Sequence, residues 1–228
     1  MNKSMRLIAL LLFFLGIGII FYPHIRQFLY ERYTREVISD FQNRIKKYQE
    51  DNSLEWLYLL MKDYNKELYE NEQHKIVDPF SFSGLSFSLR EFGFEEEMIG
   101  FITIPKMNVQ LPIYLGASDI NMERGAVHLT NTSLPIGGKN TNTVIAAHRG
   151  MSTARMFRDI ERLELGDKIS ITNFYQTIYY EVIEIKIIYP NEIDTILIQS
   201  GRDLLTLVTC HPYRSNRQRY IVVAERIR

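Results

Sequence analysis

The sequence predicts a mainly β protein whose β domain is a closed barrel or a sandwich, preceded by a membrane helix and a helical segment. Three observations lead to this prediction. An uncharged apolar run lies near the N-terminus, apolar residues with helical spacing follow it, and strand-like runs begin at Met98. Seven or eight short strands in about 130 residues, separated by Gly, Pro, Asn and Asp, are typical of a closed barrel or a sandwich.

The composition is that of an ordinary folded chain with one medium domain and accessory segments. Of its 228 residues 46% are apolar, and 27 Lys and Arg balance 27 Asp and Glu. A net charge of zero lacks the basic excess on which nucleic-acid binders depend, so we expect no nucleic-acid partner. The single cysteine can form neither an internal disulfide nor a thiolate metal site, and we expect no metal and no other cofactor.

Residues 7–22 are uncharged and mostly apolar, and Lys3 and Arg6 precede them. A secretory signal also begins with positive charge, but it ends in small residues at a cleavage site, and the YPHI that closes this run offers none. We therefore expect an uncleaved membrane anchor over residues 7–22, slightly short of the ~20 residues that span a bilayer core. Arginines also follow the span, so the flanking charges indicate its orientation only weakly.

Residues 23–75 are expected to be helical, because apolar residues recur at three- and four-residue spacing. Asp51-Asn52-Ser53 interrupts the pattern and offers an N-cap to a second helix. The charged residues between the apolar ones are most simply the solvated face.

Residues 76–92 include a stretch rich in Ser and Phe that has neither a helical nor a strand period, so we expect a loop or an extended segment. One interpretation is a plain connector. The other is a segment that covers a functional site, because exposed aromatic side chains on a loop usually pack over another surface. The aromatic residues here are Phe80, Phe82 and Phe87.

Residues 93–228 hold the β domain, in which several runs are apolar on both faces, as the central strands of a packed barrel are. The expected strands are residues 98–104, 109–115, 141–148, 167–172, 177–189, 203–210 and 219–227. A short helix is expected over Thr153–Leu163, ended by a turn at Gly166-Asp167.

Three side chains with complementary chemistry lie at strand ends. Cys210 ends an apolar strand just before Pro212, which cannot donate to a sheet ladder, so the thiol sits where the strand stops. His148 closes another apolar strand, and Arg219 opens the last one. A thiol nucleophile, an imidazole acid or base and a cation fixed near a developing oxyanion together suit acyl transfer.

Each of these residues also has a plain interpretation. A lone cysteine is often only a buried packing residue, and a lone histidine is more often a hydrogen-bonded structural residue than a catalyst. His128 remains a rival to His148, whereas His211 should point to the other face of its strand. Four further residues are less suited to a catalytic role. His24 and His74 lie outside the β region, and Arg214 and Arg217 lie in the loop before the last strand.

These residues resemble the sortase family, Gram-positive cysteine transpeptidases with an eight-stranded barrel. TLVTC, which ends at Cys210, fits the family's TLxTC signature, His148 fits its strand-end histidine, and Arg219 fits the arginine that begins the final strand. The resemblance covers residues 98–227. It implies an eight-stranded sortase-type barrel, held outside the cell by a single-pass anchor in the cell membrane with residues 1–6 in the cytoplasm.

The sequence of residues 132–150, TSLPIGGKNTNTVIAAHRG, includes His148 and is similar to the corresponding sequence of the pilus-building class C sortases. In that class a lid with an Asp-Pro-aromatic motif covers the thiol, and Asp78-Pro79-Phe80 matches the motif in type and order. The resemblance implies that Asp78 pairs with Arg219 and that Phe80 covers Cys210. Class C members commonly carry a second hydrophobic helix after the barrel, whereas this sequence stops at Arg228. We expect either that this span was lost or removed, or that the chain is anchored at its N-terminus alone.

The resemblance implies a transpeptidase in which Cys210 cleaves an LPxTG-like sorting signal between Thr and Gly through a thioester. Arg219 would stabilise the oxyanion and His148 would protonate the departing amine. The acyl group would pass to an amine, expected to be a lysine of a pilin subunit, so the partners are pilin or surface-protein substrates.

Three alternatives stay open. A housekeeping sortase, which joins surface proteins to peptidoglycan, shares the three residues and should lack the lid. A papain-like hydrolase is disfavoured because it carries its cysteine before its histidine. A membrane-tethered binding barrel without catalysis would leave the coincidence of the three residues unexplained.

Overall fold

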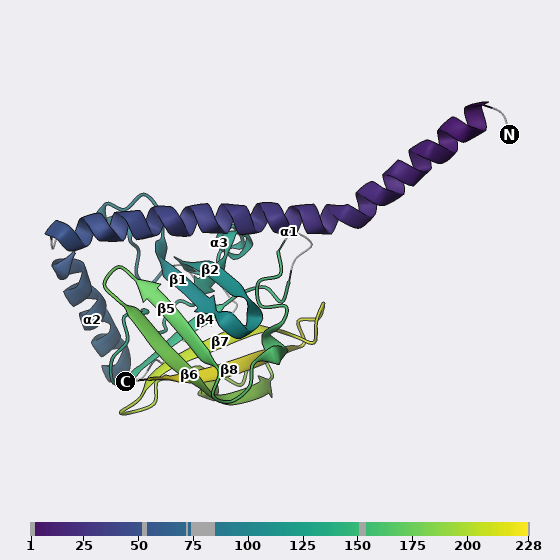
Figure 1. The fold of residues 1–228 in the computed structure, drawn as a ribbon. Helices are drawn as coiled ribbons and strands as arrows, with labels where there is room; N and C mark the ends of the chain where they lie inside the picture. Colours follow the sequence, from purple (N-terminus) through teal and green to yellow (C-terminus); the bar gives the residue numbers. More distant parts are fainter. Residues whose placement is uncertain (1–2, 52–53, 72, 74–84, 151–153, 228) are drawn as a thin grey trace.

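The fold is taken from a computed structural model, which describes residues 3–51, 54–71, 73, 85–150 and 154–227. Its strands are β1 Met98–Ile104, β2 Val109–Leu115, β3 Ala126–His128, β4 Thr141–Ala146, β5 Lys168–Asn173, β6 Thr177–Ile188, β7 Asp203–His211 and β8 Gln218–Arg226. They form one closed barrel in the order β1-β2-β3-β4-β7-β8-β6-β5 (Figure 1). The mainly β prediction is therefore confirmed.

The described helices are few and mostly short. They are α1 Lys3–Asp51, α2 Glu55–Glu70, α3 Asp119–Arg124 and the single 3-10 turns η1 Arg90–Phe92, η2 Pro105–Met107, η3 Ile160–Arg162 and η4 Asp194–Ile196. The sequence pattern predicted neither α3 nor β3. Both are too short to show a period, and β3 is held by parallel pairing with β2 and antiparallel pairing with β4.

Strand alternation gives the barrel wall two apolar faces. The inner face of β4, β7 and β8 carries residues such as Ile145, Leu207 and Val222, which belong to the large core. Their neighbours on the outer face form a second cluster: Val144, Ala146, Leu204, Val208, Ile221 and Val223. Ile196 of η4 and Met122 of α3 cover this outer cluster, which explains why these strands are apolar on both faces.

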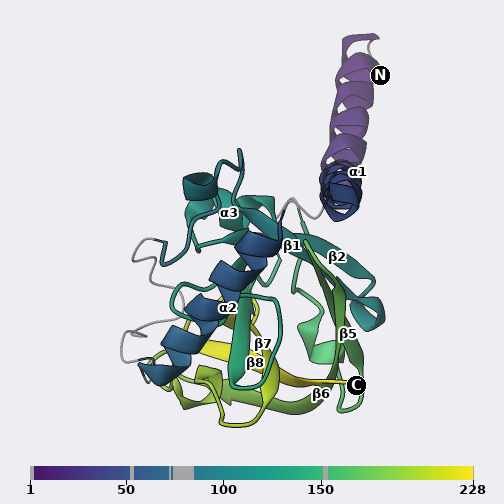
Figure 2. The same ribbon diagram turned by 90° about the vertical axis from the view of Figure 1, so that its left-hand side faces the viewer.

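Helix α1 is continuous from the expected membrane span to Asp51. Its C-terminal part lies across the barrel (Figures 1 and 2), where Ile38, Phe41 and Ile45 are buried in the large core. Its N-terminal part bends away from the barrel (Figure 1). Pro23 is the proline inside this helix, and a proline within a helix removes a backbone hydrogen bond and bends it.

Helix α2 begins differently from the prediction. The expected N-cap within Asp51-Asn52-Ser53 is wrong, because Leu54 occupies the N-cap position and makes no side-chain capping bond. Leu54 is buried in the large core, and its carbonyl accepts a hydrogen bond of 3.1 Å from Tyr175 Oη. Burial and this tertiary bond therefore set the start of α2.

The helix expected over Thr153–Leu163 is also wrong. From Ala154 onward this segment consists of turns and the short η3. Two of its backbone donors are taken by distant partners, since Phe157 N donates to His148 O at 3.0 Å and Arg155 N donates to Gln27 Oε1 at 2.8 Å, while donors such as Arg158 N and Leu163 N make i to i−3 bonds. These bonds replace the i to i−4 bonds of a helix, while the apolar side chains of the segment stay buried.

Candidate active site

Two strand pairings bring the ends of β4, β7 and β8 together. In the antiparallel pair β7–β8, Cys210 lies directly opposite Arg219. In the parallel pair β4–β7, Ala146 is in register with Val208, so the same register carried two residues further brings His148 level with Cys210. The segment that follows β4 stays bonded to β7, because Thr209 Oγ1 donates to Ala147 O at 2.7 Å.

The three side chains also share one face of the wall. Cys210 has the same strand parity as Leu204 and Val208, Arg219 has that of Ile221, and His148 has that of Ala146, all members of the outer cluster. Register and parity thus place a thiol, an imidazole and a guanidinium on the outer face at one rim of the barrel. The strand expected to end at His148 stops at Ala146, so His148 lies just past the strand.

Arg219 is buried, with 6% of its surface exposed. Its Nη1 donates to Asn216 O at 2.8 Å, in the connection from β7, and to Gln218 O at 3.1 Å, at the start of β8. These bonds restrict the orientation of the guanidinium of a residue that is paired with Cys210. Arg214 and Arg217 are exposed in the connection between β7 and β8, as expected. A pre-oriented cationic donor is suited to stabilising a developing oxyanion.

His148 is half-buried. Burial lowers its pKa below the ordinary value for histidine, against the opposing effect of Glu123 and Asp119 in α3, whose negative charges raise the pKa. A lowered pKa makes the imidazolium a stronger acid but leaves a smaller fraction of His148 protonated at physiological pH.

His128, the rival to His148, is a structural residue. Its side chain is buried, and Nε2 lies 3.0 Å from Ser133 O and 3.1 Å from Thr132 Oγ1. Burial lowers the pKa of His128 to about 4, so the ring is neutral at physiological pH.

A charged bridge that the sequence pattern did not predict lies on the inner side of the same rim. Arg149, which follows His148, is buried, with Nη1 2.6 Å from His211 Nδ1 and Nη2 2.5 Å from Glu161 Oε1. Its guanidinium lies 5.6 Å from the centre of the Tyr220 ring. The bridge ties the segment that carries His148 to the end of β7 and to η3. His211 points away from Cys210, as expected.

The two threonines of TLVTC have structural roles. Thr206 is buried and donates to Asn142 Oδ1 at 2.8 Å, while Asn142 Nδ2 donates to Leu197 O at 3.1 Å. Thr209 makes the bond to Ala147 described above. The signature therefore also fixes β7 against β4 and against the connection between β6 and β7.

The lid residues Asp78, Pro79 and Phe80 lie outside the described residues, as do Phe82 and His74. The next aromatic of the same stretch, Phe87, is described. Its ring packs at 5.8 Å from that of Tyr64 and at 5.3 Å from that of Phe92, so Phe87 covers α2 and η1.

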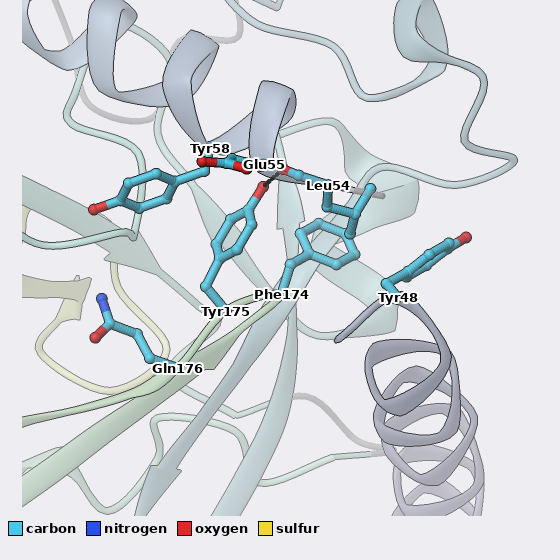
Figure 3. A pocket seen from close by; sticks show the side chains of 7 residues that line it. All are labelled: Tyr48, Leu54, Glu55, Tyr58, Phe174, Tyr175 and Gln176. Carbon is cyan, nitrogen blue, oxygen red and sulfur yellow. Dashed lines mark hydrogen bonds between the residues drawn. The ribbon is translucent and has the colours of Figure 1, made fainter. Parts of the chain in front are cut away.

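A cavity of about 620 Å³ lies at the other end of the barrel, between the end of α1, the start of α2 and the β5–β6 turn. Figure 3 shows its lining, which is largely aromatic: Tyr48, Leu54, Glu55, Tyr58, Phe174, Tyr175 and Gln176. Because β6 and β7 both run antiparallel to β8, this turn lies far from the rim that carries Cys210. The cavity is therefore separate from the candidate site.

With this geometry in place, comparison with known proteins identifies the family. The sequence model described as the sortase domain matches residues 102–227, more than half of the chain. The chain therefore belongs to the sortase family, whose members are cysteine transpeptidases.

Curated relatives include Sortase D of Bacillus subtilis (strain 168), 30% identical over 131 residues, and Sortase A of Streptococcus agalactiae serotype III, 31% identical over 132 residues. Each match covers 56% of this chain. The matches cover 63% and 52% of those proteins, which is less than two thirds of either.

Solved structures of class C sortases are similar over most of the chain. Sortase C of Streptococcus pneumoniae is 34% identical with a TM-score of 0.76, covering 85% of this chain and 97% of that one. The pilus-related Sortase C of Group B Streptococcus is 36% identical with a TM-score of 0.73, covering 84% and 97%. Sortase C of Clostridium perfringens SM101 is 32% identical with a TM-score of 0.71, covering 85% and 99%.

Proposed function

We propose that this chain is a membrane-anchored cysteine transpeptidase that polymerises pilins. It would cleave an LPxTG-like sorting signal between Thr and Gly and transfer the acyl group to a pilin lysine. The observation that carries the proposal is the joint register of β4, β7 and β8, which supports His148, Cys210 and Arg219 acting on one substrate. The class C neighbours, one of them titled as pilus-related, support pilins as the substrates.

The chemistry follows from the three groups. The Cys210 thiolate attacks the threonine carbonyl carbon, a C–S bond forms, and the oxygen becomes an oxyanion that the Arg219 guanidinium stabilises. As the tetrahedral intermediate collapses, the Thr–Gly C–N bond breaks and His148 gives its proton to the departing glycine amine. A lysine amine then attacks the thioester, His148 takes up the amine proton, and the thiolate leaves.

Membrane anchoring rests on α1. Its N-terminal part is long and apolar enough to cross a membrane. Apart from the half-buried Ile17, the large apolar side chains between Leu7 and Tyr22 are at least 53% exposed. In water this surface would be costly, whereas in a bilayer it is favourable. Helices near an N-terminus also include secretory signals, but the buried contacts of Ile38 and Phe41 make α1 part of the folded protein, which favours an uncleaved anchor.

The proposal is tested by mixing the full-length protein in detergent with a recombinant pilin that carries an LPxTG-type signal and separating the products on denaturing gels. We expect a ladder of covalent pilin polymers with the wild type and none with Cys210→Ala. Cleavage without a ladder would indicate an acyl acceptor other than a pilin lysine, such as peptidoglycan. An unchanged ladder with Cys210→Ala would refute the mechanism.

The lid proposal concerns Asp78 and Phe80 and is tested separately. If the segment covers Cys210, replacing both residues by alanine should speed labelling of the thiol by a maleimide. An unchanged labelling rate would leave the segment as a connector.

A further inference from the structure

A second cavity, of about 730 Å³, lies where α1 meets the rim of the candidate site. Three parts of the chain line it: α1, the segment that follows His148, and the β7–β8 turn. In Figure 1 this turn (yellow) is at the end of the barrel toward which the N-terminal part of α1 extends. The cavity therefore opens at the junction between the anchor and the catalytic barrel.

The lining of this cavity is rich in arginine. Arg155, Arg158 and Arg214 contribute to it, and none of the described residues that line it is Asp or Glu. A neighbouring cavity of about 240 Å³ shares Arg155, but there Glu31 and Asp159 balance the arginines. An arginine-rich lining without a described Asp or Glu therefore distinguishes the 730 Å³ cavity, which is suited to an anionic ligand.

Two of the arginines are stacked on a shared aromatic ring. The guanidinium carbons of Arg158 and Arg214 lie 5.6 Å and 5.4 Å from the centre of the Tyr213 ring. Gly150 leaves room for Arg158, since a Cβ there would lie 2.5 Å from Arg158 Nε, and its φ of +89° suits glycine. Stacked, planar guanidinium groups are pre-oriented donors for the oxygens of a phosphate.

The cavity lies at the depth of lipid head groups if α1 spans the membrane. Its lining begins with Tyr22, the last residue of the apolar run, and continues with Pro23 and His24. Tyrosine is enriched at the membrane–water interface, and Arg26 lies 5.9 Å from the Tyr22 ring centre, which adds a further cation there. Phosphates of membrane lipids are the anions available at this depth.

We propose that this cavity binds the phosphate of an anionic phospholipid head group from the membrane that holds α1. A bound lipid would join the anchor, the segment after His148 and the β7–β8 turn, and so hold the Cys210 rim at the membrane surface. The proposal rests on the proposed membrane anchoring and is independent of which protein is the substrate.

The test uses the full-length protein in nanodiscs of phosphatidylcholine, with or without phosphatidylglycerol, and native mass spectrometry of the lipids that stay bound after release. The pocket variant is Arg155→Gln with Arg214→Gln. The matched control is Arg44→Gln with Arg90→Gln, two exposed arginines outside the cavity. We expect the wild type and the control to retain phosphatidylglycerol in preference to phosphatidylcholine, and the pocket variant to retain about 10- to 30-fold less of it.

Equal retention of phosphatidylglycerol by the pocket variant and the control would overturn the proposal, as would equal retention of the two lipids by the wild type. Binding of inorganic phosphate alone, without lipid retention, would also overturn it. Co-elution of the protein with nanodiscs is scored separately: a chain that does not co-elute refutes the anchoring, whereas normal co-elution with unselective lipid retention refutes the lipid site alone.

Discussion

At the scale of single residues, the candidate site depends on the fixed orientation of the Arg219 and Arg149 side chains and on the shifted pKa of His148. Arg219 is held by the carbonyls of Asn216 and Gln218, and Arg149 by His211 and Glu161. His148 is tuned by burial against the charges of α3. His148, Cys210 and Arg219 could be proposed from the sequence because they lie at or near expected strand ends and fit the sortase signature. Arg149 and Glu161 could not be paired, because their contact depends on the irregular path of residues 154–163.

Arg219→Ala should reduce kcat/KM for an LPxTG-type peptide by roughly 10²–10³, because the oxyanion would lose its fixed cation. Arg219→Lys should recover only part of the rate, since an ammonium group cannot reproduce the geometry of the guanidinium. The control is Arg217→Ala, an exposed arginine of the same connection, which should keep near-normal activity. Near-normal kinetics in Arg219→Ala would remove this residue from the mechanism.

Glu123→Gln should lower the pKa of His148 further, because the negative charge of Glu123 opposes the effect of burial. Imidazolium is lost as pH rises through the pKa, so in the variant the protonated form of His148 should disappear at lower pH than in the wild type. NMR titration of the histidine ring resonances measures this directly, with Glu181→Gln, an exposed carboxylate on β6, as control. An unchanged or higher pKa would contradict this electrostatic account.

Arg149 is a positioning residue, and Arg149→Ala should lower kcat/KM roughly 10- to 100-fold by loosening the segment that carries His148. Arg149→Lys should rescue part of this loss because it keeps the charge beside Glu161. The control is Arg162→Ala, an exposed arginine on η3. A variant with a lowered Tm and unchanged kcat/KM would show that the bridge serves stability alone.

At the scale of elements, the long strands were predictable and the short or tertiary-held elements were not. Runs such as Met98–Ile104 and Val109–Leu115 carry enough β-branched residues to be recognised, and β1 and β2 have these bounds. The three residues of β3 carry no pattern. Residues 154–163 place apolar side chains at helical spacing, yet two of their backbone donors bond to His148 and Gln27 and the others that bond locally make i to i−3 bonds. Local pattern cannot anticipate such long-range bonds.

Helix α1 should contribute strongly to stability through Phe41, which is fully buried and packs at 6.3 Å and 5.1 Å from the rings of Phe101 and Phe174. Phe41→Ala should lower the free energy of unfolding by about 3–5 kcal/mol, because it removes apolar burial and leaves a cavity. Chemical denaturation in detergent measures the change, with Phe28→Ala, exposed on the same helix, as control. Equal effects of the two substitutions would show that α1 does not belong to the core.

At the scale of the whole molecule, α1 joins an apolar surface suited to lipid to a catalytic barrel. The same helix is largely exposed before Tyr22 and buried at Phe41, so its apolar N-terminal part is continuous with a segment that packs on the barrel. The Cys210 rim and the basic cavity lie at the end of the barrel nearest the bend at Pro23. The apolar run and the three candidate site residues could be picked out in the sequence. Their position at the same end of the barrel could not, because it depends on the path of α1 and on the register of β4 with β7.

The most direct test of the central claim is the intact mass of the full-length protein after brief incubation with an LPxTG-type peptide. We predict a covalent adduct equal to the peptide up to its threonine, mapped to Cys210, removed by hydroxylamine and absent in Cys210→Ala. Release of the glycine-containing fragment should accompany it. Cleavage of the peptide without a thioester at Cys210, or an equal rate of cleavage by Cys210→Ala, would contradict the account.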